Sequence, residues 1–199
     1  MIEQGSGDLL AAEVDAMVNA VNTVGVMGKG LARSLPGSSN VLGSIEAVGA
    51  EWVLLGIVDD LRLDGWECVR LAETTAVVRG ASERFAEKII RSEHPKDVGP
   101  PEVALGNTVA LLRSLGSARL IALECEEDGD FLLGHVVRVG PRSADVHAVS
   151  STGTWGERAV RVQLADLTRL QFGTHYNAMF ERYASARHAP AGAVPRLRG

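Results

Sequence analysis

The sequence predicts an α+β protein in which a short β-α-loop-α segment is followed by two repeated small antiparallel β-barrel units, each with a trailing helix. Three observations predict this fold class. Near the N-terminus, apolar residues recur at helical spacing and lead into a glycine-rich stretch. Short apolar runs between turn residues, which are typical of strands, dominate the rest of the chain. Two blocks of sequence in that part occur twice, in the same order.

The β-α-loop-α segment covers residues 1–36. A short strand opens at Ile2, and the stretch from Glu13 to Val21 places apolar residues on one face of a helix. The glycine-rich stretch from Gly25 to Gly30 then frees the backbone for positive φ. A second helix follows it and ends where turn residues begin at Pro36.

The rest of the chain divides by composition into four parts. Residues 41–93 are expected to form the first small β-barrel unit, with a helix that has Ser82 as its N-cap. Residues 94–117 form a linker and a helix. Residues 118–185 form the second β-barrel unit, which ends in its own helix. Residues 186–199 are expected to be a disordered tail, because terminal residues of this composition fray.

The repeated blocks relate the two barrel units. The pattern Leu-Gly-x-Ile-x-x-Val-Gly at residues 42–49 matches Leu-Gly-x-Val-x-x-Val-Gly at residues 133–140, so Gly43 and Gly134 lie 91 residues apart. The pattern Leu-Ala-Glu-x-Thr beginning at Leu71 matches Leu-Ala-Asp-x-Thr 93 residues later. Two blocks in order at nearly one spacing indicate an internal duplication with a short insertion between them.

The repeat also leaves a gap in the first unit. The second unit has an initial strand at residues 119–124, and nothing equivalent lies between Pro36 and Leu42. Either Met1 to Leu10 supplies that strand, or the first barrel is incomplete. Small barrels of the Sm or SH3 type need such a strand to close.

Composition narrows the class of protein. The chain has 199 residues, 46% of them hydrophobic and 23% charged, which is ordinary for a globular protein. No apolar run approaches the ~18 residues of a membrane helix, and no signal peptide is visible. The net charge of −5, with dispersed basic residues, argues against direct nucleic-acid binding. Two cysteines make no disulfide framework, so a cytoplasmic location is expected.

Recognisable chemistry is confined to the N-terminal segment. It comprises Gly-Asp-Leu-Leu at residues 7–10, Val-Asp-Ala-Met-Val-Asn-Ala-Val-Asn at residues 14–22 and Gly-Val-Met-Gly-Lys-Gly at residues 25–30. In this order and spacing, residues 1–34 resemble the start of an ADP-ribose-binding macrodomain, in the branch of antitoxin glycohydrolases that remove ADP-ribose from DNA. The resemblance does not extend into the rest of the chain.

Closely spaced backbone N–H groups ahead of a helix N-terminus suit a diphosphate, and an asparagine amide suits a ribose hydroxyl. The resemblance implies that Asp8 holds the adenine end of ADP-ribose and that Asn22 holds the distal ribose. It also implies that Gly28 to Gly30 hold the phosphates, with Lys29 complementing their charge. The implied ligand-binding residues are Asp8, Asn19, Asn22, Gly25, Val26, Met27, Gly28, Lys29 and Gly30. Considered without the resemblance, Asp8 is a turn residue, Asn19 a helix-surface amide and the glycines a flexible loop.

The resemblance implies a complete macrodomain with a second glycine-rich phosphate loop, and nothing after Asn40 resembles that loop. With one wall of the cleft missing, a dinucleotide-sized ligand would not be enclosed. The glycohydrolase branch is also expected to use a later lysine, but neither Lys88 nor Lys96 lies in a matching motif. Catalytic residues therefore stay unassigned.

Three functions stay open. The first is a macrodomain-like protein with a truncated ADP-ribose-binding motif and without full glycohydrolase activity, whose partner is ADP-ribose or an ADP-ribosylated macromolecule. The second is a non-enzymatic protein-interaction module of two Sm- or SH3-like barrels, with the N-terminal segment as a remnant. The third is an active ADP-ribosyl glycohydrolase. No cofactor and no membrane partner are expected.

Other candidate residues are given structural roles. The histidines His135, His147 and His175 are too dispersed for metal-ligand spacing, so no metal is expected, and His147 is taken as a structural strand residue. The tryptophans are taken as core or hairpin anchors and Cys68 as a buried, inert thiol. The acidic residues of the hairpin region, Asp59, Asp60 and Asp64, are expected to form a solvated turn. Glu124, Glu126, Glu127 and Asp128 form an acidic turn that could bind a cation, but a surface loop is favoured because no glycine-ordered calcium loop is present.

Overall fold

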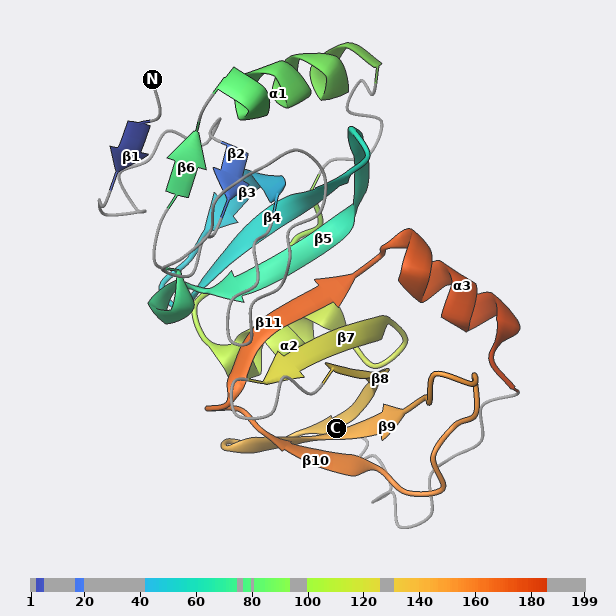
Figure 1. Ribbon diagram of the computed structural model, residues 1–199. Helices are drawn as coiled ribbons and strands as arrows, with labels where there is room; N and C mark the ends of the chain where they lie inside the picture. The colour runs from blue at the N-terminus through green and yellow to red at the C-terminus, as the bar shows by residue number, and fades with distance from the viewer. Residues whose placement is uncertain are drawn as a thin grey trace. The chain divides into compact units, whose positions relative to one another are not determined.

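A computed structural model describes residues 3–5, 17–19, 42–74, 77–79, 81–93, 100–125 and 131–185. The chain divides into two compact units, which we call unit 1 (Met1–Asn107) and unit 2 (Thr108–Gly199). Each unit combines antiparallel strands with few helices, so the α+β class is confirmed (Figure 1). None of the helices within these ranges is long and apolar enough to cross a membrane.

Unit 1 is built on a four-stranded antiparallel arrangement in the order β2-β3-β4-β5, while β1 pairs separately with β6. A 3-10 turn at Leu71–Glu73 separates β5 from β6. Its strands and helix are β1 (Glu3–Gly5), β2 (Met17–Asn19), β3 (Leu42–Val48), β4 (Trp52–Asp59), β5 (Arg62–Arg70), β6 (Val77–Arg79) and α1 (Ala81–Glu93).

Unit 2 has five antiparallel strands in the order β10-β9-β8-β7-β11. No pairing joins β10 to β11, so the described strands do not close into a barrel, and the predicted barrels are not confirmed. Its elements are α2 (Thr108–Leu115), β7 (Leu120–Cys125), β8 (Phe131–Val139), β9 (Ser143–Ala148), β10 (Val160–Gln163), β11 (Leu167–Phe172) and α3 (His175–Tyr183).

Strand register in the two units repeats with the offsets of the sequence blocks. Gly43 of β3 pairs with Ile57 of β4. Gly134 of β8 pairs with Ala148 of β9, and both members of this pair lie 91 residues beyond their counterparts. A register shift follows Ile45 in the first hairpin, and the equivalent shift follows residue 136 in the second.

Backbone hydrogen bonds repeat in the same way. The N–H of Gly49 donates to Trp52 O at 2.8 Å, and the N–H of Gly140 donates to Ser143 O at 2.9 Å. After β5 in unit 1 and after β10 in unit 2, the chain contacts the turn that joins the two preceding strands. There Leu71 N donates to Glu51 O and Leu164 N to Arg142 O, each at 2.9 Å. The two-residue difference in offset therefore falls between the second and third strands.

The predicted helix from Glu13 to Val21 is wrong at Met17–Asn19, which forms strand β2. Val18 pairs with Gly43 of β3, as Ile121 of β7 pairs with Gly134 of β8. The edge of β3 offers unpaired backbone groups, and pairing with this segment satisfies them. The strand missing from the first unit is therefore supplied on this side by β2 rather than by Met1 to Leu10.

Strand β1 lies within the predicted Met1 to Leu10 stretch and takes the other side. It pairs with β6, with Gly5 opposite Val77. In unit 2 the single strand β7 pairs with both β8 and β11. In unit 1 the two equivalent pairings are made by two strands, β2 with β3 and β1 with β6.

The helix boundaries follow local signals in two of three cases. Helix α2 ends at Leu115, and the next residue, Gly116, has a φ of 75°, which glycine readily adopts. Helix α3 begins after Thr174, whose hydroxyl accepts from Asn177 N. Helix α1 begins at Ala81, so the prediction of Ser82 as its N-cap is wrong.

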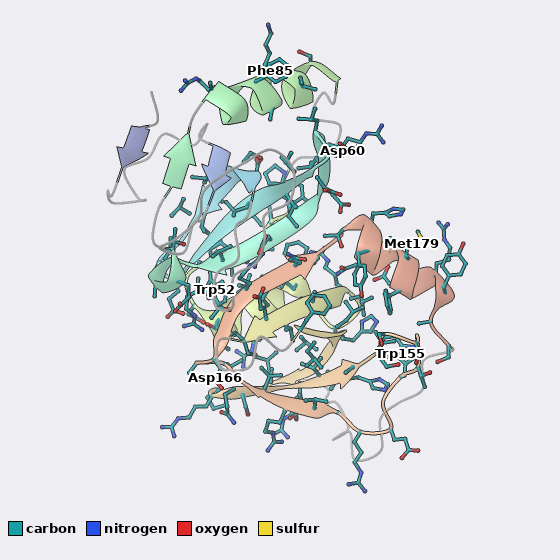
Figure 2. The ribbon with its side chains drawn as sticks, in the orientation of Figure 1. Trp52, Asp60, Phe85, Trp155, Asp166 and Met179 are labelled. Atoms are coloured by element: carbon teal, nitrogen blue, oxygen red, sulfur yellow. The ribbon has the colours of Figure 1, made fainter. Side chains whose placement is uncertain are left out.

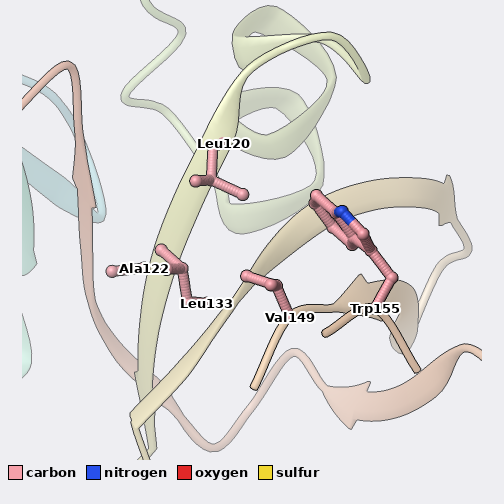
Figure 3. Packing of buried hydrophobic residues seen from close by; sticks show 5 residues of the cluster. All are labelled: Leu120, Ala122, Leu133, Val149 and Trp155. Atoms are coloured by element: carbon pink, nitrogen blue, oxygen red, sulfur yellow. The ribbon is translucent and has the colours of Figure 1, made fainter. Parts of the chain in front are cut away.

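Each unit has its own apolar core. In unit 1 it comprises Ile45, Val53, Leu55 and Val69, contributed by the three long strands. In unit 2 it comprises Leu120, Ala122, Leu133, Val149 and Trp155 (Figure 3), with Phe180 of α3 packed against them. Burying side chains of this size stabilises a fold by roughly 1.5–3 kcal/mol each.

Candidate functional site

Only one of the predicted ADP-ribose-binding residues falls within the described part of the chain. Asn19 is the last residue of β2 and pairs with Leu42, so its interpretation as a helix-surface amide is wrong. Asp8, Asn22 and the residues from Gly25 to Gly30 lie outside the described residues.

The described residues offer a different candidate, an exposed aromatic surface on unit 2. We define it as Phe131, Tyr176 and Phe180. The rings of Phe131 and Tyr176 meet edge to face with centroids 6.1 Å apart, and those of Tyr176 and Phe180 lie 4.8 Å apart. Phe131 is 52% exposed and Tyr176 is 49% exposed. Large exposed aromatic side chains that touch one another are typical of protein contact surfaces.

Helix α3 presents this surface because Tyr176 and Phe180 are four residues apart, so they share a helix face. A polar contact holds the helix in place on β7. Asn177, which is only 2% exposed, donates from Nδ2 to Leu120 O at 2.8 Å. At the end of the helix, Glu181 Oε1 accepts from Leu120 N at 3.2 Å. The aromatic rings are therefore carried on an anchored helix.

A hollow of about 650 Å³ with a mixed polar and apolar lining lies beside the same helix. Arg119 and Glu181 give it one charge of each sign, and the Arg119 guanidinium lies 5.0 Å from the centroid of the Phe172 ring. A hollow with balanced charge has no strong preference for either anions or cations. Its lining residues are Leu115, Gly116, Ser117, Ala118, Arg119, Leu120, Gly173, Thr174, Asn177, Ala178 and Glu181.

Two histidines and a tryptophan form a buried group in unit 2. His135 and His147 are register partners, and their rings lie 5.2 Å and 5.1 Å from the Trp155 ring. His147 Nε2 lies 2.8 Å from Gly156 O, so it acts as the donor. The prediction of His147 as a structural histidine is confirmed. Figure 2 shows Trp155 within this part of the unit.

Metal-binding and thiol chemistry find no support in the described ranges. No group of three or more His, Cys, Asp or Glu side chains that could hold a metal is present there. Cys68 is fully buried, and burial, reinforced by the nearby charge of Glu67, raises its pKa to about 12. Such a thiol is protonated at neutral pH, which confirms its predicted inertness.

The remaining sequence predictions have mixed outcomes. Trp52 is completely buried and Trp155 nearly so, which confirms their role as anchors. Asp60 lies in the turn between β4 and β5, as predicted. The prediction of Glu124 as a turn residue is wrong, because it lies in strand β7 and forms an ion pair with Arg169 at 3.0 Å. The acidic residues that follow Glu124 lie outside the described residues.

Comparison with known proteins gives one short match. A stretch of 32 residues in the N-terminal region is 69% identical to the DNA ADP-ribosyl glycohydrolases of Mycobacterium bovis and Mycobacterium tuberculosis. The match covers 16% of this chain and spans 9% of the length of those relatives. No family model matches the chain, and no solved structure matches it significantly. In this one stretch, the chain is similar to DNA ADP-ribosyl glycohydrolases.

Proposed function

We propose that the chain is a macrodomain-like protein with a truncated ADP-ribose-binding motif joined to a duplicated β body, and that it does not complete a glycohydrolase reaction. The ligand would be ADP-ribose or an ADP-ribosylated macromolecule. The proposed ligand class rests on the 69% identity over 32 residues to proteins named DNA ADP-ribosyl glycohydrolases. The match spans 9% of those proteins, which supports truncation.

The fold supports the loss of catalysis. Strand β2 lies inside the macrodomain-like segment and pairs with β3 in the register that β7 adopts on β8. The segment thus contributes backbone to the β body. The described residues that follow it repeat one strand pattern twice, and this pattern leaves no counterpart for the second phosphate loop of a dinucleotide cleft.

Calorimetric titration of the full chain with ADP-ribose tests this proposal, together with an assay for ADP-ribose release from ADP-ribosylated DNA. We expect one-to-one binding that Asn22→Ala weakens at least tenfold, because the amide is expected to bond the ribose. Asn40→Ala is the matched control and should leave affinity unchanged. We expect no release of ADP-ribose. Turnover abolished by Asn22→Ala would show that the chain is an active glycohydrolase.

A non-enzymatic protein-interaction module is the second candidate, and the aromatic surface favours it. A partner that offers aliphatic or aromatic side chains would bury Phe131 and Tyr176. The first partner to test is a second copy of the chain, by sedimentation velocity over a range of concentrations. Association that Tyr176→Gln removes and Arg182→Ser retains would support this module. A well-folded chain that stays monomeric would exclude self-association through this surface.

A further inference from the structure

A second, smaller pocket in unit 2 gathers two arginines around one carboxylate. It has a volume of about 220 Å³. Arg138 of β8 and Asp145 of β9 are register partners, and Arg161 of β10 is the partner of Asp145 on its other side. We call these three residues the charged row. The pocket is lined by Arg138, Gly140, Pro141, Ser143, Asp145 and Arg161.

Within the charged row, the Asp145 carboxylate holds the Arg161 guanidinium in place, and the three residues together carry a net positive charge. Arg161 Nε donates to Asp145 Oδ1 at 2.9 Å, which raises the pKa of Arg161 and keeps it charged. A guanidinium held through Nε keeps its two terminal nitrogens for another acceptor. Arg138 is exposed, and within residues 100–125 and 131–185 no carboxylate forms an ion pair with it. Two positive charges thus face one negative charge.

Unit 1 serves as an internal control for the charged row. The positions that correspond to the row in strand register are Ala47, Leu54 and Cys68, none of which is charged. Leu54 and Cys68 are buried there. Because the same register forms without any charge, the strand arrangement does not require the arginines.

The turn next to the charged row is also more positively charged in unit 2 than its counterpart in unit 1. The turn closed by Gly49 in unit 1 contains Glu51, while the turn closed by Gly140 in unit 2 contains the exposed Arg142 at the equivalent position. This end of unit 2 therefore exchanges an acidic residue for a basic one next to the charged row. The positive charge gathers at one place although the whole chain carries a net charge of −5.

We propose that this pocket binds a phosphate group. The planar fork of a guanidinium matches two oxygens of a phosphate, and two arginines from different strands can hold one group from two sides. Ser143 also lines the pocket, and a serine hydroxyl can donate to a third oxygen. Pockets for drug-sized ligands have volumes of about 300–1,000 Å³, so this smaller pocket suits a single phosphate. None of the pocket's residues belongs to the N-terminal segment, and the proposal does not depend on ADP-ribose binding.

Nuclear magnetic resonance titration of the full chain with inorganic phosphate, and separately with AMP, tests the site. The readout is the shift of the arginine Nε–Hε signals. Two charge-assisted contacts predict a Kd on the order of 1 mM. Arg138→Gln and Arg161→Gln should each weaken binding at least tenfold. Arg158→Gln removes an exposed arginine outside the pocket and should not change the affinity, and neither should Asn22→Ala.

A short single-stranded DNA distinguishes the two sources of phosphate. If the group comes from a nucleic-acid backbone, the oligonucleotide binds more tightly than AMP and loses affinity steeply with added salt. If the phosphate comes from a small molecule, the oligonucleotide and AMP bind with equal affinity. Either of these two outcomes supports a phosphate site. The proposal would be overturned if the parent failed to saturate at about 10 mM phosphate. Equal melting temperatures of Arg138→Gln and the parent would show that both are folded. An equal loss of affinity in Arg158→Gln would overturn the proposal as well.

Discussion

Gly134→Ala tests whether the repeated strand register depends on the glycines of the Leu-Gly blocks. A Cβ at this position would lie 2.5 Å from His147 O, 2.7 Å from Val146 Cγ1 and 3.0 Å from Ala148 Cα. Two of these three atoms belong to the backbone of β9, which is fixed by pairing on both sides. The new methyl group cannot be accommodated by a side-chain rotation alone.

The magnitude follows from two opposed effects. Relief of the closest contact to ordinary van der Waals distance requires β8 and β9 to separate locally by about 0.9 Å, and overpacking of this kind costs about 1–3 kcal/mol. Alanine also lowers the conformational entropy of the unfolded chain, which stabilises the folded state by about 0.4–1 kcal/mol. The difference between the two effects is about 0–2.6 kcal/mol, and its central value of about 1.3 kcal/mol corresponds to a decrease in Tm of about 3–5 °C for a chain of this length.

Differential scanning calorimetry measures this loss, with Gly106→Ala as the control. A Cβ at residue 106 would meet nothing within 4 Å, so that variant should melt at the parent temperature or slightly above it. Gly43→Ala occupies the equivalent place in unit 1, where the Cβ would lie 2.6 Å from Gly56 O, and it should be destabilised to a similar degree. An unchanged Tm for Gly134→Ala would refute the argument from close strand approach.

Three further predictions follow from local geometry. Leu61 has a φ of 62° in the two-residue turn between β4 and β5, so Leu61→Gly should raise the free energy of unfolding by about 1 kcal/mol in urea titrations, whereas Leu63→Gly in extended backbone should lower it. The Cys68 thiol has a folded pKa of about 12 against an ordinary value of 9.0. Above pH 9 the thiol ionises in the unfolded chain but stays protonated in the folded one, so the free energy of unfolding is unaffected below pH 9 and falls above it by about 1.4 kcal/mol per pH unit. The difference in stability between the parent and Cys68→Ala should therefore be constant up to pH 9 and decline from there; a constant difference up to pH 11 would contradict the assigned pKa. Asn177→Ala removes the donor to Leu120 O and should lower the free energy of unfolding by about 1–3 kcal/mol, while Ala178→Ser on the exposed side of α3 should leave the chemical-denaturation midpoint unchanged.

Much of the strand arrangement could be predicted from sequence because the signal was local and occurred twice. The Leu-Gly blocks predicted a common pattern, and Gly43 and Gly134 occupy equivalent places in two hairpins. Helix α3 lies where residues 118–185 were predicted to end in a helix.

Strand β2 could not be predicted in this way. The apolar residues Val14, Met17, Val18 and Val21 have helical spacing, and the tertiary partner that overrides this preference is β3, more than 20 residues later. Pairing with a distant strand decides the conformation of such a short segment.

The candidate surfaces were missed because their residues are far apart in the sequence. Arg138, Asp145 and Arg161 are unremarkable charges until the register of three strands aligns them. Phe131 and Tyr176 are 45 positions apart and meet only because α3 lies against the unit's sheet. Periodicity within one segment contains no information on such contacts.

Pairing between β2 and β3 has a consequence for solubility. An uncovered strand edge recruits strands from other molecules, and short edge strands such as β2 limit this association. A chain that begins after Asn40 would leave Leu42 to Ser44 without their neighbour and would be prone to aggregate. Strand β2 would thus help to keep molecules apart whether or not the N-terminal segment binds a ligand.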